Sequence, residues 1–366
     1  MKLAHLEWSL QYNNPFKGAF FEFVMVNYVL IISIMVSFVL TLVMLPDWIR
    51  KCRVSGLLWE DMNKFDHPKN VASSGGVVVV LSFVLGVLTY VALKTFVFEG
   101  TVRALEIFSL VSVILILSIV GLVDDLFGWR NGGLTRKFRF LLALIASIPL
   151  VVINAGVHFA NIPFFGVVEF GILYPLILIP LGIAGATTTF NFLAGYNGLE
   201  AGQGILILSF LSYVAYSTGS AWLAIAGLCM VVSLIGFYLF NKFPAKVFPG
   251  DIMTYSIGAL IAGMAILGNF EKIAFIVFIP YILEVILKVR GGLLKQSFGI
   301  PDKYGRLSMP YKKIYGLEHL AIFILNGFRK NPVSGGNFYA TERRVTYLIH
   351  IFQILFIFIG FLTLSP

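Results

Sequence analysis

Long apolar runs alternate with short polar segments along almost the whole chain. Ten of these runs approach the roughly 20 residues that a helix needs to cross about 30 Å of hydrocarbon. We therefore predict an all-α, polytopic integral membrane protein in which residues 1–366 form a single transmembrane domain. The ten expected spans are 24–45, 75–93, 105–123, 138–157, 171–190, 205–217, 221–240, 252–267, 274–289 and 345–364.

Some of these runs carry irregularities. The sixth is short, so we expect its helix to begin nearer Leu199 or to tilt. Pro175, Pro180 and Pro280 fall inside expected spans, where proline can kink a transmembrane helix.

The 27 lysine and arginine residues are divided unequally between the two sides of the expected spans. Most lie in or beside segments that follow odd-numbered spans. The other side holds only Lys2, Lys17, Lys94, Arg103 and Lys272. Because short cytoplasmic loops are rich in lysine and arginine, we place the basic set in the cytoplasm and both termini outside. The longest polar segment, 291–342, should then be a structured cytoplasmic loop.

The composition supports the membrane class. The chain is 58% hydrophobic and 12% charged, whereas soluble domains have roughly 25% charged residues. The net charge of +9 is explained by topology-setting loops. No nucleic-acid-binding module is recognisable, and we expect no nucleic-acid partner. Cys52 and Cys229 lie far apart in sequence, so neither a disulfide nor a metal cluster is expected.

The most distinctive polar stretch is 187–204, which lies between two apolar runs. It contains Asn191, Asn197, Glu200 and Gln203, but no lysine or arginine. Its glycines allow sharp turns and close approach of the backbone to a ligand. A simple connection would not need this composition, so we predict a ligand-binding loop at the membrane surface.

Acidic residues follow the third span and precede the eighth. Asp124 and Asp125 are adjacent, so their charges repel unless a cation or a basic side chain lies nearby. Carboxylate oxygens are the ligands that Mg²⁺ prefers, although a solvated helix end would also accommodate the pair. Asp251 either caps the eighth helix or binds metal, and its two oxygens allow both.

Three further polar residues lie on the same predicted side. Lys137 is singled out because a phosphate site near the acidic pair needs a cation, although anchoring at the bilayer is the alternative. Asn63 and Ser74 belong to a polar segment before the second span. The Ser-Ser-Gly-Gly turn there offers free backbone N–H groups for an anionic ligand, and an ordinary amphipathic loop is the alternative.

Together these motifs resemble the polyprenyl-phosphate N-acetylhexosamine-1-phosphate transferase superfamily. The resemblance is strongest to its eukaryotic and archaeal branch, the UDP-N-acetylglucosamine–dolichyl-phosphate N-acetylglucosamine-1-phosphotransferases. The matching segments are 56–64, 124–125, 191–203 and 248–251, and their order and the ten-helix layout also match. The Asn-Gly-Leu-Glu-Ala-Gly sequence at 197–202 is similar to the dolichol branch, because bacterial branches usually carry Asp-Gly there.

The resemblance implies a role for each matching residue. It implies that Asn191 and Asp251 hold Mg²⁺, or Mn²⁺ in its place, with the pyrophosphate. Asp124, Asp125 and Lys137 match the catalytic acidic pair and a lysine near the phosphates. The implied substrate-binding residues are Asn197 for uracil, with Glu200, Asn63 and Ser74. The histidine- or arginine-rich signature that family members carry before the last helix is missing here, and Lys303 and Arg306 are the candidate phosphate-binding cations in its place. This departure leaves the identity of the sugar undecided.

The resemblance also implies a reaction. N-acetylglucosamine-1-phosphate would pass from UDP-N-acetylglucosamine to a polyprenyl or dolichyl phosphate in the lipid bilayer of the cell or the endoplasmic reticulum. Another UDP-N-acetylhexosamine is an alternative donor, and a homodimer remains open. A secondary transporter is the alternative from a different class, but transporters place polar groups near the bilayer midplane, whereas here they gather at span ends.

Overall fold

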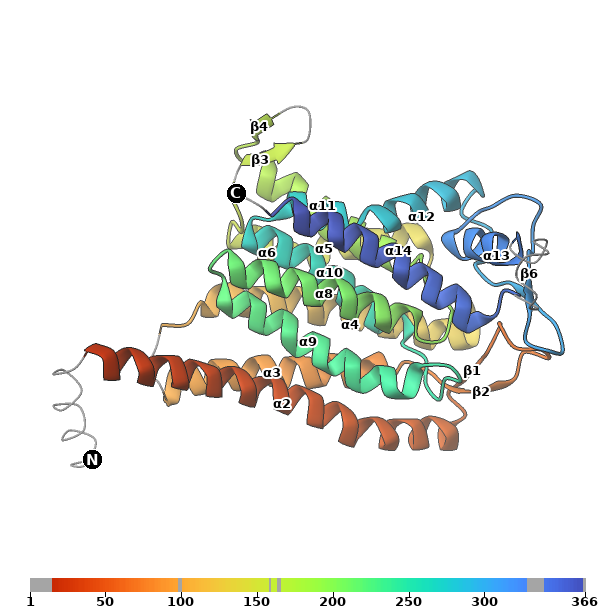
Figure 1. The fold of residues 1–366 in the computed structure, drawn as a ribbon, viewed down its shortest axis with the longest axis horizontal. Helices are drawn as coiled ribbons and strands as arrows, with labels where there is room; N and C mark the ends of the chain where they lie inside the picture. The colour runs from red at the N-terminus through yellow and green to blue at the C-terminus, as the bar shows by residue number, and fades with distance from the viewer. Residues whose placement is uncertain (1–14, 98–100, 158, 163–165, 328–338, 365–366) are drawn as a thin grey trace, which may run out of the picture.

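The computed structural model describes residues 15–97, 101–157, 159–162, 166–327 and 339–364. Its long helices run side by side to form a bundle, and short strands lie at both ends (Figure 1). Within the described residues, strands occur only as three antiparallel two-stranded hairpins. This architecture confirms the predicted all-α membrane fold.

Seven helices in the described part of the chain are long and apolar enough to cross a membrane. They match seven of the ten predicted spans, and the start of the sixth at Leu199 is confirmed. These helices are α2 (Pro15–Ser55), α3 (Gly76–Phe96), α4 (Ala104–Asn131), α8 (Leu199–Ser217), α9 (Ala221–Asn241), α10 (Gly250–Gly268) and α14 (Glu342–Leu362).

The other three predicted spans are shorter or irregular helices. These are α5 (Arg136–Ala146) with α6 (Ile148–Val152), η1 (Tyr174–Leu178) with α7 (Ile179–Phe190), and α11 (Glu271–Val277) with α12 (Ile279–Arg290). A proline opens the second segment of each pair: Pro149, Pro180 and Pro280. A one-residue turn at Ser147 breaks the first of these spans and one at Phe278 breaks the third, whereas η1 continues into α7 without a break. Proline lacks an N–H and clashes with the preceding turn, which favours such a break or a π-helical turn. The prediction of ten spans therefore counts apolar runs, two of which form broken helices.

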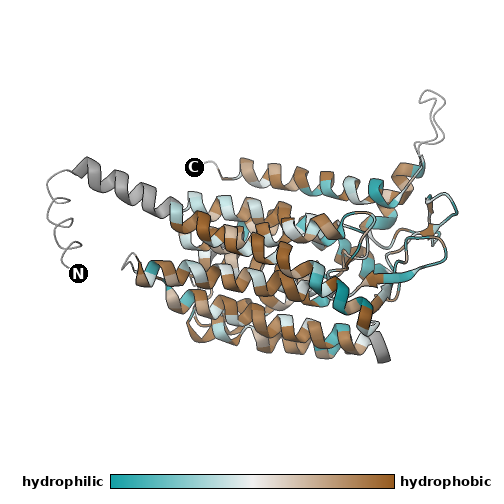
Figure 2. Cartoon of the chain, turned by 90° about the horizontal axis from the view of Figure 1, so that it is seen from below, coloured by the Kyte–Doolittle hydropathy of each residue, from teal (hydrophilic) through white to brown (hydrophobic). Residues whose placement is uncertain are grey.

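Helix α10 is the centre of the bundle, where it packs against α3, α4 and α7. Of the most apolar 18-residue stretch of α10, 83% is buried, compared with 28% for α2 and for α14. Helices α2 and α14 therefore lie at the periphery of the bundle and turn apolar side chains toward lipid. Apolar residues extend along the helices, and hydrophilic residues gather mainly toward one end (Figure 2).

Two hairpins occupy that end (Figure 1). Strands β1 (Leu58–Glu60) and β2 (Lys69–Ala72) pair with each other, and the N–H of Phe248 donates to the Ala72 carbonyl at 2.8 Å. Strands β5 (Ile300–Pro301) and β6 (Leu307–Ser308) precede α13 (Leu317–Gly327). In its described residues, the segment 291–342 is thus structured as expected. Its cytoplasmic location stays a prediction.

The third hairpin, β3 (Phe159–Ile162) with β4 (Gly166–Glu169), lies at the opposite end of the bundle (Figure 1). Helix α2 begins at that end, and α14 ends there. The two helices nearest the chain termini therefore share one side, as the charge pattern predicts. Which side of the membrane this is stays a prediction.

Close contact between α7 and α10 depends on Gly258. A Cβ atom at this position would lie 2.6 Å from Thr187 Cα and 2.7 Å from the Ala186 carbonyl oxygen. Small residues of this kind let membrane helices approach each other closely. The contact fixes α10 beside the end of α7, which carries part of the site described below.

We predict that Gly258→Ala destabilises the bundle, because the added methyl group meets backbone atoms that cannot give way. The free energy of unfolding should fall by about 1–3 kcal/mol. The melting temperature of the detergent-purified protein measures this. Gly185→Ala is the matched control, since a Cβ atom at that position of α7 meets nothing within 4 Å. Equal melting temperatures for the two variants would contradict the prediction.

Candidate active site

A cavity of about 340 Å³ lies at the hydrophilic end of the bundle. Its wall combines the β1–β2 hairpin, the C-terminal part of α4, the loop after α7, the first turn of α8, the start of α10 and one residue beyond α12. The lining residues are Trp59, Glu60, Met62, Ser73, Asp125, Asn191, Ala194, Gly195, Tyr196, Glu200, Phe248, Pro249, Gly250, Asp251, Thr254 and Phe298.

Asp125 links α4 to α10. Helix α4 continues to Asn131, so Asp125 lies within it and not in a loop. One carboxylate oxygen, Oδ1, accepts the backbone N–H of Asp251 at 2.7 Å. Asp125 therefore caps α10 from a neighbouring helix, while Asp251 itself lies in the first turn. The Asp125 carboxyl group also lies close to the Ser74 side chain. Its other oxygen, Oδ2, is buried and accepts no hydrogen bond of normal geometry within the described residues.

Gly250 allows this contact. Its φ of +72° is in the left-handed region, and a Cβ atom there would collide with Oδ2 of Asp125. The same Cβ atom would lie 3.0 Å from Cα of Ser74. Ser74 is fully buried behind this junction, whereas its neighbour Ser73 lines the cavity. The Pro-Gly-Asp sequence therefore sets the position of Asp125 as well as the start of the helix.

Arg139 joins two other carboxylates of the site. Its Nη1 donates to Asp124 Oδ2 at 2.5 Å and to Asp251 Oδ2 at 3.0 Å. The second oxygen of Asp124 accepts the backbone N–H of Leu134. Asp124 is thus used to hold Arg139 and the segment before α5, and it does not line the cavity. The two residues of the acidic pair therefore make different contacts, and of the two only Asp125 lines the cavity.

The predicted cation, Lys137, is exposed at the start of α5. Residues 137 and 139 lie two positions apart, about 200° around the helix, so they point in opposite directions. Sequence reasoning missed Arg139, although a signal was present. Arg139 has the i, i+4, i+7 spacing of one helix face with Ala143 and Ala146, the buried residues of α5.

Asn191 ends α7 and faces the start of α10. Its backbone N–H donates to the Thr187 carbonyl, and its Oδ1 accepts the hydroxyl of Thr254 at 3.0 Å. Asn191, Asp125 and Asp251 all line the cavity. The fold therefore brings two carboxylates and one amide, which are far apart in sequence, to the wall of the same cavity.

Side chains from two directions hold the glycine-rich loop beyond Asn191. Glu200 Oε1 accepts the N–H of Gly195 at 2.8 Å, and Asn63 Nδ2 donates to the Gly195 carbonyl at 2.9 Å. Gly195 has a φ of +101° and packs against the Phe298 ring, 2.7 Å from where a Cβ atom would lie. Burial raises the pKa of Tyr196, so its hydroxyl stays neutral and donates to the Ser297 carbonyl at 3.3 Å.

Of the six predicted substrate-binding residues, only Glu200 lines the cavity, and five lie outside its lining: Asn63, Ser74, Asn197, Lys303 and Arg306. Asn197 is only 4% exposed, and its Nδ2 donates to Asp61. Lys303 lies 6.0 Å from the Phe65 ring centre, and the Arg306 guanidinium stacks over the Tyr339 ring at 4.0 Å. Their binding roles stay predictions. Conversely, the aromatic lining residues Trp59, Phe248 and Phe298 were not anticipated, because only the tertiary fold brings them together.

Comparison with known proteins identifies the family. The model of glycosyl transferase family 4 matches residues 107–269. A protein from Saccharolobus solfataricus is 36% identical over 80% of this chain and 88% of its own length. The chain belongs to glycosyl transferase family 4. The family match includes Asp125, Asn191 and Asp251, and membership confirms the predicted resemblance.

The names of family 4 relatives describe related transfers. The Saccharolobus protein is provisionally named a UDP-N-acetylglucosamine–dolichyl-phosphate N-acetylglucosaminephosphotransferase. A Dictyostelium discoideum protein with that name is 30% identical over 71% of this chain and 70% of its own length. A phospho-N-acetylmuramoyl-pentapeptide-transferase from Halalkalibacterium halodurans is 29% identical over 72% of this chain and 84% of its own.

We predict that Arg139→Met destabilises this family 4 protein, because it leaves two neighbouring carboxylates without their cation. The expected loss is about 2 kcal/mol, less than the about 3–5 kcal/mol for breaking a fully buried pair, since the Arg139 side chain is 24% exposed. Thermal unfolding measures the loss. Lys137→Met is the matched control and should change stability by less than about 0.5 kcal/mol. The opposite ranking would show that Arg139 does not hold the acidic residues.

Proposed function

We propose that this protein transfers N-acetylglucosamine-1-phosphate from UDP-N-acetylglucosamine to a dolichyl-type polyprenyl phosphate. UMP is released, and the product is the pyrophosphate-linked lipid that begins a lipid-linked oligosaccharide. The observation that carries the proposal is the cavity in which Asp125, Asn191 and Asp251 meet at one end of the membrane-spanning bundle. A soluble nucleotide and a lipid-anchored phosphate can meet only at such a boundary. The names of the Saccharolobus and Dictyostelium relatives support the same reaction.

The reaction exchanges one phosphorus–oxygen bond for another. An oxygen of the lipid phosphate attacks the β-phosphorus, which carries the sugar, and forms the new pyrophosphate bond. The bond from the β-phosphorus to the bridging oxygen breaks, and its electron pair leaves with UMP. Phosphoryl transfer depends largely on positioning and on stabilising negative charge. The site therefore needs rigid walls and positive charge more than a strong base.

The residues of the cavity fit a bound Mg²⁺, with Mn²⁺ as an alternative. Asp125 Oδ2 is buried and unpartnered in the described structure, and an isolated buried carboxylate is costly without a counter-charge. Asp251 and Asn191 add oxygen donors of the kind that Mg²⁺ prefers. No group of three Asp, Glu, His or Cys side chains suited to metal occurs in the described residues, so substrate phosphates and water would complete the ligand set. The ion would neutralise charge on the diphosphate.

The chain's own residues prepare the cavity. Arg139 keeps Asp251 oriented through their 3.0 Å hydrogen bond, and Asp124 keeps Arg139 in place. Trp59, Phe248 and Phe298 supply aromatic faces on which a nucleobase can stack. Lys137, Asn197, Lys303 and Arg306 do not line the cavity, and their roles in binding substrate stay predictions.

The proposal also covers which sugar is transferred and in which membrane the protein lies. Relatives act on different N-acetylhexosamine derivatives by name, so another UDP-N-acetylhexosamine for a different surface glycan is the second candidate. We infer that the site faces the cytoplasm, in the cell membrane or the endoplasmic reticulum, because the basic loops share its end. Nothing in the described structure favours a transporter, whose polar groups would lie near the midplane.

Purified protein should form labelled lipid and release UMP when given polyprenyl phosphate, Mg²⁺ and radiolabelled UDP-N-acetylglucosamine. Removal of divalent ions by EDTA should abolish the signal, and added Mg²⁺ should restore it. Mass spectrometry of the lipid after a screen of UDP-sugars identifies the preferred donor. Absence of labelled lipid with every donor would reject the proposal.

Asp125→Asn and Asp251→Asn should each lower kcat by at least about 10³-fold, because each removes negative charge from the proposed metal site. Both are nearly isosteric, so the melting temperature should change little. Asp47→Asn is a matched control at the exposed end of α2, where Asp47 pairs with Arg50 and Lys51. Turnover near that of the wild type in either site variant would remove that residue from the metal site.

A further inference from the structure

A buried ionic cluster lies beside the glycine-rich loop and outside the cavity lining. We name Asp61, Lys64, Asn197 and Glu342 the clasp. Lys64 Nζ lies 3.1 Å from Asp61 Oδ2 and also pairs with Glu342 Oε2. Glu342 Oε1 accepts the backbone N–H of Asn197 at 2.8 Å, and Asp61 Oδ2 accepts Asn197 Nδ2 at 3.3 Å. The clasp thus joins three segments that are distant in sequence.

The burial of the clasp makes its geometry restrictive. Asp61, Asn197 and Glu342 are 5%, 4% and 3% exposed. A buried charge is tolerated only when its partners and hydrogen bonds are well placed. Both oxygens of Glu342 are used, one by the Lys64 ammonium group and one by a backbone N–H. Any shift of Asn197 would therefore leave a buried carboxylate oxygen unpaired.

The glycine-rich loop needs such an external restraint. Gly195 and Gly198 have φ values of +101° and +81°, and glycine carries no side chain to fix its own conformation. Ala194, Gly195 and Tyr196 form part of the cavity wall. Asn197 follows them directly, so its backbone position sets where this wall lies.

We propose that Glu342, supported by Asp61 and Lys64, is a positioning residue that holds the 194–198 loop in the shape that receives the nucleotide sugar. This rests on the proposed function. Glu342 does not line the cavity and acts through the Asn197 backbone. The role extends to the first turn of α14, which begins at Glu342, the residue that the sequence analysis placed at the end of the 291–342 loop.

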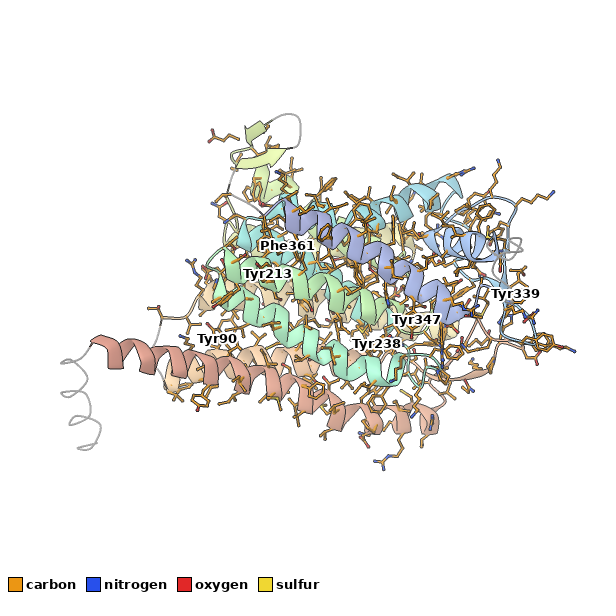
Figure 3. The ribbon with its side chains drawn as sticks, viewed as in Figure 1. Tyr90, Tyr213, Tyr238, Tyr339, Tyr347 and Phe361 are labelled. Carbon is orange, nitrogen blue, oxygen red and sulfur yellow. The ribbon has the colours of Figure 1, made fainter. Side chains whose placement is uncertain are left out.

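The segment before α14 fixes Glu342 in turn. The N–H of Leu307 in β6 donates to the Ala340 carbonyl at 2.8 Å, and Asn326 Oδ1 of α13 accepts the Ala340 N–H at 3.0 Å. Tyr339 lies at this end of the bundle, close to the β5–β6 hairpin (Figure 3). The hairpin and α13 can therefore influence the cavity wall through the clasp, although neither contributes a lining residue.

The test compares Glu342→Ala with Glu342→Gln in the full-length purified protein. Glu342→Ala should raise the KM for UDP-N-acetylglucosamine about tenfold, the loss expected for a hydrogen bond to a charged group. The KM for polyprenyl phosphate and kcat should change less than about threefold. Glu342→Gln should recover most of the affinity, because its amide oxygen still accepts the Asn197 N–H. Amide hydrogen exchange across 194–198 should quicken in Glu342→Ala and stay near wild type in Glu342→Gln.

Glu271→Gln is the matched control at the opposite end, where the carboxylate accepts a hydrogen bond from Tyr174. It should leave both KM values and exchange at 194–198 unchanged. Unchanged exchange in Glu342→Ala, or an equal rise in both KM values, would overturn the positioning role. Failure of the wild-type protein to release UMP would instead overturn the proposed function, and with it the effect of Glu342 on catalysis.

Discussion

Three carboxylates and one guanidinium, which pairs with two of them, lie where α4, α5 and α10 come together at the end of the bundle. Arg139 contacts Asp124 and Asp251, and Asp125 caps α10 with one oxygen while its other oxygen stays unpartnered in the described structure. This arrangement holds more negative than positive side chains next to a low-dielectric membrane. The divalent cation that we propose would offset this charge and bind the open oxygen.

The fold keeps this arrangement rigid. Helix α10 is the most buried of the long helices, and Gly258 lets α7 approach it closely. Gly250 then admits the Asp125 carboxylate against the first turn of α10. Helix α7 ends where the cavity begins, so Asn191 at its C-terminus faces the start of α10. Packing in the middle of the bundle thus determines the geometry of a site at its end.

Much of this could be read from the sequence, and the exceptions have physical reasons. The apolar runs predicted the spans, and the polar motifs at their ends identified Asp125, Asn191 and Asp251, which the fold brings to one cavity. Lys137 was predicted as the cation near the acidic pair because of its charge alone. The residue that actually pairs with these carboxylates is Arg139, because its side chain points toward them from the other face of α5. Glu342 and the aromatic wall could not be found, because their partners lie up to 278 residues away in sequence.

The central claim is that Asp125, Asn191 and Asp251 share one divalent ion with the nucleotide sugar. The most direct measurement is anomalous diffraction from crystals of the protein with Mn²⁺ and UDP-N-acetylglucosamine. The account predicts a single strong peak within about 2–2.5 Å of oxygens from Asp125 and Asp251, with the diphosphate beside it. A peak held by Asp124 and not Asp125, or nucleotide bound with no ion near these residues, would contradict it.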